Sequence, residues 1–135
     1  MTAEETRMEI GSNWTERADG WWLSVPATSI QKIAYTMLKA EARFVTIVAL
    51  SEPANEMQLS WHWDMGGTLL SVVSLVAESV SVPSIVDIYP GADWAERETR
   101  DYYAVTFEGR KETPTLMLRT GDKPGSFLRT SGDRL

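Results

Sequence analysis

Carboxylates and arginines gather in one short stretch, residues 94–103, which reads Trp-Ala-Glu-Arg-Glu-Thr-Arg-Asp-Tyr-Tyr. Its three carboxylates, Glu96, Glu98 and Asp101, could form the acid/base pair that glycoside hydrolysis needs, with the neighbouring aromatic rings binding a sugar. On a helix, however, each carboxylate has an arginine within reach, as in the pair Glu96–Arg100. A nearby arginine favours the ionised carboxylate and works against a general acid with a raised pKa. The spacing therefore favours a salt-bridged helix over a hydrolase site.

The single histidine and the glycine-rich segments are the other candidates for chemistry. His62 lies in the middle of an expected strand with only Asp64 as an acid on the same face, so we expect a surface or packing histidine. No Gly-x-Ser-x-Gly nucleophile elbow occurs. The segments Gly66-Gly67 and Gly121–Gly125 lack the spacing of a phosphate loop or a dinucleotide fingerprint. The residues alone thus indicate an interaction or structural protein without an active site of its own.

The absence of cysteine excludes several classes of site. Without cysteine there is no disulfide, no thiolate zinc site, no cysteine-ligated iron–sulfur cluster and no cysteine nucleophile. One histidine cannot supply a metal site made of several histidines. We therefore expect no catalytic residue, no cofactor-binding residue and no metal ligand in this chain.

Length and charge exclude further classes of protein. The 135 residues fit one domain, and the 43% of hydrophobic residues suffice for one core. Thirteen basic against 19 acidic residues give a net charge of −6, which is not the basic footprint of a nucleic-acid binder. No apolar run approaches the ~20 residues of a membrane span, and the acidic start is unlike a signal peptide. We therefore expect a soluble, intracellular protein that binds no nucleic acid.

Two helices are predicted from capping signals and apolar periodicity. Thr28 and Gln31 have the spacing of a capping box, and apolar residues then recur at helical intervals over Ile30–Leu38. Asp93 and Glu96 have the same spacing at the start of the acidic stretch, which predicts that Asp93 is the N-cap of the second helix.

Alternating and β-branched runs predict the strands. Strands are expected over residues 21–25, 43–50, 57–65, 68–77, 105–108 and 115–119. Turns are expected at 18–20, 52–55 and 66–67. Within 57–65 every second residue is apolar, which predicts a half-buried strand with its tryptophans facing inward.

The order of these elements predicts an α+β fold. We expect a two-layer domain over residues 1–120, with two helices packed on one face of a mixed β-sheet and residues 1–6 frayed. Residues 121–135 are glycine-rich and carry several basic side chains, so an extended C-terminal arm is expected, held mainly by contacts outside the domain.

The stretch 82–98, Val-Pro-Ser-Ile-Val-Asp-Ile-Tyr-Pro-Gly-Ala-Asp-Trp-Ala-Glu-Arg-Glu, resembles the signature of a known family. It is similar to the thirty-kilodalton subunit of respiratory complex I, the NADH:quinone oxidoreductase. The similarity continues through Asp101-Tyr102-Tyr103 and Phe107-Glu108-Gly109 and covers roughly residues 22–119. The family usually has glycine where Ala104 stands and histidine where Arg110 stands. The signature residues that the resemblance marks as a partner interface are Trp94, Glu96, Arg97, Glu98, Asp101, Tyr102 and Tyr103.

The resemblance implies an accessory, structural subunit in the peripheral arm of a membrane-bound complex, on the cytoplasmic side of the cell membrane. Such a subunit holds no flavin and no iron–sulfur cluster. Its partners are the other peripheral-arm subunits, chiefly the large subunit that helps to form the quinone site, and it meets the membrane only through the complex. The equivalent subunit of a membrane-bound energy-converting hydrogenase is an alternative. A small independent hydrolase using Glu96, Glu98 or Asp101 is the alternative from a different class.

Overall fold

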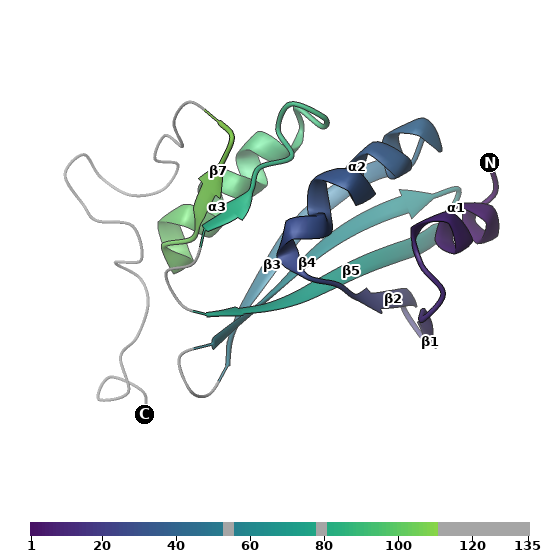
Figure 1. Cartoon of the computed structure of the whole chain (residues 1–135), viewed down its shortest axis with the longest axis horizontal. Helices are drawn as coiled ribbons and strands as arrows, with labels where there is room; N and C mark the ends of the chain where they lie inside the picture. The colour runs from purple at the N-terminus through teal and green to yellow at the C-terminus, as the bar shows by residue number, and fades with distance from the viewer. Residues whose placement is uncertain (53–55, 78–80, 111–135) are drawn as a thin grey trace.

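A mixed five-stranded β-sheet is the largest element of the computed structural model, which describes residues 1–52, 56–77 and 81–110 (Figure 1). Its strands are β1 (Thr15–Arg17), β2 (Gly20–Ser24), β3 (Arg43–Glu52), β4 (Glu56–Met65) and β5 (Thr68–Ala77). They lie in the order β1-β2-β5-β4-β3. Strands β2 and β5 are parallel, whereas the other neighbours are antiparallel. The predicted mixed sheet is confirmed.

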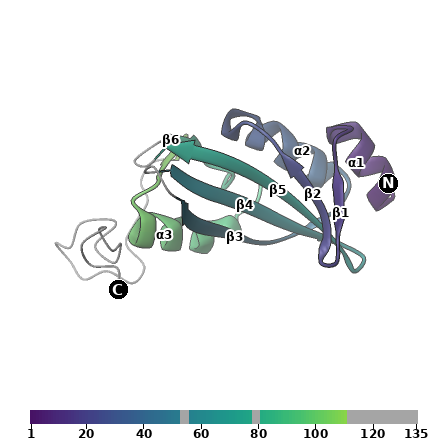
Figure 2. The ribbon, with the colours of Figure 1, turned by 90° about the horizontal axis from the view of Figure 1, so that it is seen from below.

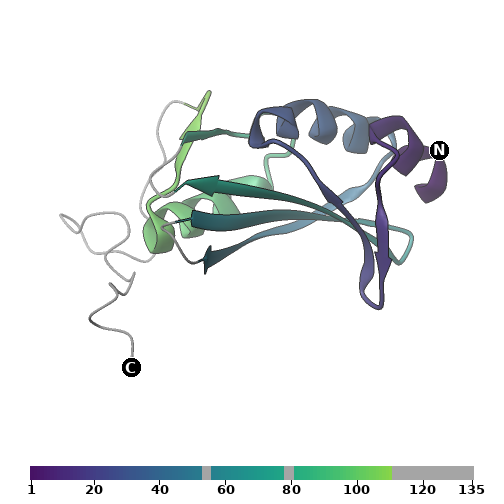
Figure 3. The ribbon, with the colours of Figure 1, turned by 60° about the horizontal axis from the view of Figure 1, so that its bottom comes forward.

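Helices α2 (Ile30–Lys39) and α3 (Ala92–Tyr103) both lie above the long strands in Figure 1. Two short strands, β6 (Ser81–Pro83) and β7 (Thr106–Glu108), form a second, parallel sheet beside α3 (Figure 3). The α+β class with helices on one face of the sheet is therefore confirmed, and the second sheet is an addition to it.

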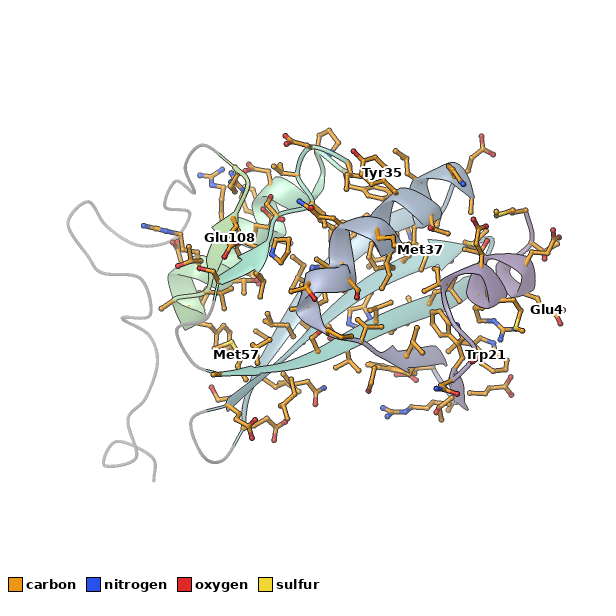
Figure 4. The ribbon with its side chains drawn as sticks, in the orientation of Figure 1. Glu4, Trp21, Tyr35, Met37, Met57 and Glu108 are labelled. Atoms are coloured by element: carbon orange, nitrogen blue, oxygen red, sulfur yellow. The ribbon has the colours of Figure 1, made fainter. Side chains whose placement is uncertain are left out.

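One hydrophobic core lies between the helices and the sheet, because every second side chain of a strand points to the same face. Trp61 and Trp63 of β4 are fully buried there, as the alternation predicts. In α2 most of the periodic apolar side chains are buried: Met37 faces the sheet, whereas Tyr35 points away from it (Figure 4). The prediction is wrong for Leu38, the last residue of the pattern, which is 45% exposed. A Gly66-Gly67 turn with positive φ at both residues joins β4 to β5, as expected for a tight hairpin.

The other side of β4 is less exposed than a half-buried strand would be. His62 is buried on that side, with its Nε2 2.9 Å from the hydroxyl of Ser60 and its Nδ1 2.7 Å from the hydroxyl of Ser71. The rings of His62 and Trp22 meet edge to face, with their centroids 5.5 Å apart. Of the two expected roles, surface or packing, His62 has the packing role.

The prediction of a frayed N-terminus is wrong. Residues Ala3–Ile10 form helix α1, and Thr2 and Glu5 form a complete capping box at its start. Each residue satisfies a backbone N–H of the other, which stabilises the first turn. Figure 2 shows α1 next to α2.

The capping box expected at Thr28 is also wrong. Residues Ala27–Ser29 form a 3₁₀ turn, and Ser29 is the N-cap of α2 without a side-chain hydrogen bond. The amide of Gln31 instead donates to the carbonyl oxygen of Ser84, 3.0 Å away. Gln31 binds Ser84, so its side chain does not form the capping box with Thr28.

Some predictions lie outside the described residues: most of the 52–55 turn, the strand over 115–119 and the arm over 121–135. Within the described part of the chain, no helix has the length and apolar character that a membrane crossing requires.

Candidate functional site

The carboxylate of Glu96 attaches helix α3 to the segment that follows β6. The side chain is fully buried. Its Oε1 accepts a hydrogen bond from the hydroxyl of Ser84 at 2.7 Å, and its Oε2 accepts one from the backbone N–H of Ile85 at 2.9 Å. A buried carboxylate needs such donors, because water is not available to solvate its charge.

Arg110 neutralises this buried charge. One guanidinium nitrogen donates to Oε1 of Glu96 at 2.9 Å, and the other donates to Asp93. Burial by itself lowers the pKa of Arg110, but the hydrogen bonds to Asp93 and Glu96 outweigh burial and hold that pKa above its ordinary value. The arginine therefore stays charged and binds both Asp93 and Glu96. We call the buried Glu96 carboxylate, with its hydrogen-bond donors, the anchor of α3.

The capping box predicted for Asp93 and Glu96 is wrong, because both side chains bind Arg110. Gly91 is the N-cap of α3 and has no side-chain cap, so Asp93 lies inside the first turn. There it forms ion pairs with Arg110 and, at 3.6 Å, with Arg97. A negative charge in the first turn is favourable for the helix dipole. Glu96 faces inward to Arg110 and does not form the surface pair with Arg100 that helical spacing suggested.

The remaining signature residues divide between the inside and the outside of α3. Asp101 is fully buried, with Oδ1 3.5 Å from a guanidinium nitrogen of Arg100. Tyr103 is half-buried and packs against the core. Trp94 is 61% exposed, Glu98 is exposed and Tyr102 is half-buried.

Trp94, Glu98 and Tyr102 recur at every fourth residue, so they lie on one face of α3. We call this set the α3 stripe. It combines two aromatic rings with one carboxylate, and aromatic rings are the side chains most often found at the centre of protein interfaces. The buried anchor of Glu96 holds the stripe in a fixed orientation.

The three carboxylates of the acidic stretch lie in different surroundings. Glu96 and Asp101 are buried, whereas Glu98 lies at the surface. Glycoside hydrolysis needs two carboxyl groups on either side of one substrate bond. The arrangement of these three carboxylates therefore differs from that of a glycoside hydrolase.

Two residues that matter for this site are not predicted from the sequence. Ser84 belongs to the family signature, but nothing in the sequence indicates that its side chain binds Glu96. Arg110 is notable in the sequence only because it replaces the usual histidine. They lie 12 and 14 residues from Glu96 along the chain, beyond helical reach. One signal in the sequence does point to such residues. Glu96 lies on the inner face of a predicted helix, and a buried carboxylate requires hydrogen-bond donors from elsewhere in the chain.

Comparison with known proteins identifies a family and several relatives. Residues 23–130 match the family described as "Respiratory-chain NADH dehydrogenase, 30 Kd subunit". A similar protein is the C subunit of the NADH-quinone oxidoreductase of Rhodopseudomonas palustris (strain BisB18), 33% identical over 57% of this chain and 40% of the relative. The corresponding C subunit of Rhodobacter capsulatus is 32% identical over 61% of this chain and 45% of the relative.

A third relative carries a different name. The J subunit of the NAD(P)H-quinone oxidoreductase of Synechococcus sp. (strain CC9902) is 34% identical over 64% of this chain and 44% of the relative. The matches span less than half the length of each of these relatives. The family match, in contrast, covers most of the chain and includes β6, all of α3 and β7. The chain belongs to the family of the respiratory-chain NADH dehydrogenase 30 kDa subunit.

Proposed function

We propose that this chain is an accessory subunit of a membrane-bound NADH:quinone oxidoreductase and that it acts by holding other subunits together. The observation that carries the proposal is the family match over residues 23–130, with relatives named as subunits of NADH-quinone oxidoreductase. In this proposal the chain lies in the peripheral arm, on the cytoplasmic side of the membrane.

The α3 stripe is the contact that we assign to the large subunit of the quinone site. Its exposed Trp94 offers a large apolar area, and Glu98 one turn away offers a charge that a partner's lysine or arginine can pair with. The anchor at Glu96 fixes the helix before binding, which lowers the entropic cost of association.

The chain holds no redox centre of its own in this proposal. The sequence contains no cysteine for an iron–sulfur cluster. A visible absorbance of flavin or of an iron–sulfur cluster in the purified chain would contradict this part.

Affinity purification from membranes tests the docking. The full chain is tagged in its native host, and the subunits that co-purify are identified and quantified by mass spectrometry. Trp94→Ala should weaken binding by about 2 kcal/mol, roughly thirtyfold in affinity, as for a central interface aromatic. Tyr35→Ala is the matched control, since Tyr35 is equally exposed on α2 and should leave co-purification unchanged.

Two results would contradict the proposal. Recovery of hydrogenase subunits in place of NADH:quinone oxidoreductase subunits would assign the chain to a different complex. Equal recovery with the parent chain and with Trp94→Ala would remove the α3 stripe from the interface.

A further inference from the structure

The face of the sheet opposite the core is not covered by any described helix. Seen from below, strands β3, β4 and β5 are unobstructed (Figure 2). The side chains on this face follow from the register, because Leu50, Gln58 and Leu75 are direct partners across three strands. Val48, Ser60 and Val73 form the next row. We call this surface the open face.

Three apolar side chains of the open face are exposed. Val48 is 40% exposed, Leu50 51% and Leu75 60%. Leu75 borders a groove of about 430 Å³, which is also lined by Arg17, Trp22, Ser24, Gln58 and Val73 among others. Gln58 and Ser60 of β4 separate the apolar side chains of β3 from those of β5. Exposed apolar side chains close to a groove are typical of a surface that another polypeptide covers.

The same end of the open face carries two carboxylates in an unfavourable arrangement. Glu52 and Glu56 are direct partners across β3 and β4, on the same side as Leu50. Both are half-buried, and within the described part of the chain neither forms an ion pair. Like charges placed directly opposite one another in a sheet are destabilising. A cation placed between them would relieve the repulsion.

We propose that the open face binds an apolar segment of another protein and that a lysine or arginine of this segment pairs with Glu52 and Glu56. The apolar side chains supply the contact area, and the opposed carboxylates set the required charge of the partner. A second copy of this chain fits less well, because each copy carries a net charge of −6 and the two would repel. This surface is separate from the α3 stripe, and the proposal does not depend on the identity of the complex.

A photo-reactive group at Leu75 tests the proposal. The full chain, with Leu75 replaced by benzoylphenylalanine, is expressed in its native host and irradiated, and the crosslinked peptide is sequenced by mass spectrometry. The expected product is a peptide of a different protein that is mainly apolar and contains a lysine or arginine. The same group at Tyr35, on the opposite side of the molecule (Figure 4), should not give that peptide.

The charge requirement is tested by a second variant. Replacing Glu52→Gln and Glu56→Gln together should reduce the crosslink at Leu75 by about fivefold, as expected when two rim charges lose their partner. The same double variant of the isolated chain should unfold at an equal or slightly higher temperature, because a repulsion has been removed. If the two carboxylates had only a structural role, a lower crosslink yield would be accompanied by a lower unfolding temperature. A lower yield at unchanged stability therefore indicates a contact with the partner.

Several results would overturn the proposal. These are a crosslink to a second copy, to residues 121–135 of the same chain, to lipid or to an acidic segment, and the absence of a specific crosslink. A yield that does not change in the double variant would also overturn it.

Discussion

Replacing Glu96 by glutamine should destabilise the isolated chain strongly. The amide keeps the size of the side chain but removes its charge, so Arg110 faces a neutral group in a buried site. The glutamine amide also carries an N–H₂ group, which donates hydrogen bonds and accepts none. This group would face donors, because Ser84, Ile85 and Arg110 all donate to the carboxylate of Glu96. Breaking a buried ion pair by removing one partner costs about 3–5 kcal/mol.

This loss is a large part of the stability of a domain, which is about 5–15 kcal/mol in total. At this chain length about 1 kcal/mol corresponds to roughly 3 °C, so Glu96→Gln should lower the melting temperature by roughly 9–15 °C. The assay is urea unfolding followed by tryptophan fluorescence, with thermal unfolding by circular dichroism as a second measurement.

Glu98→Gln is the matched control on the same helix. Its side chain is exposed, so the free energy of unfolding should change by no more than about 0.5 kcal/mol. Ser84→Ala should cost about 1–2 kcal/mol, and its effect should be smaller when Glu96 is already glutamine. A free energy of unfolding for Glu96→Gln within about 1 kcal/mol of the parent, or an effect equal to that of Glu98→Gln, would refute this structural role of Glu96.

Three further changes should alter stability in defined directions. Burial lowers the pKa of His62 below its ordinary 6.5, although Asp19 partly opposes this, so the unfolded chain takes up the proton first. Stability should therefore be highest above pH 6.5 and fall as the pH drops below it, and a His62→Gln variant should show a flatter urea-unfolding profile over that range. Ala104→Gly should stabilise the chain by about 0.5–1 kcal/mol, because Ala104 has a left-handed φ of 59° that favours glycine; a lower melting temperature would contradict this. Gly20→Ala should cost at least about 2 kcal/mol in urea unfolding, since φ is 127° and a Cβ would overlap a backbone carbonyl, whereas Gly91→Ala, with open space around it, should have little effect.

The regular elements were predictable because their signals are local. The alternation over 57–65 depends only on the two-residue period of a strand, and it placed Trp61 and Trp63 in the core correctly. The helical spacing from Ile30 to Leu38 identified the buried face of α2 in the same way, except that Leu38 itself is exposed.

Capping was predicted poorly because a capping side chain has alternatives elsewhere in the fold. Gln31 and Glu96 have the correct spacing, but Ser84 binds both of them, the first through its carbonyl oxygen and the second through its hydroxyl. The capping box that does form, at Thr2 and Glu5, has the same signature and no competing partner in the described chain. The candidate site depended on such distant contacts, so its buried anchor could not be derived from spacing alone.

The parallel pairing of β2 with β5 has a consequence for the order of folding. Strands β3, β4 and β5 follow one another through short connections, so their contacts form between neighbouring parts of the chain. The carbonyl of Val25, by contrast, accepts a hydrogen bond from Ser74, 49 residues away. Closing so long a loop is slow compared with forming a hairpin. During synthesis on the ribosome, β2 therefore cannot pair with β5 until β5 has emerged, and we expect β3, β4 and β5 to pair with one another first.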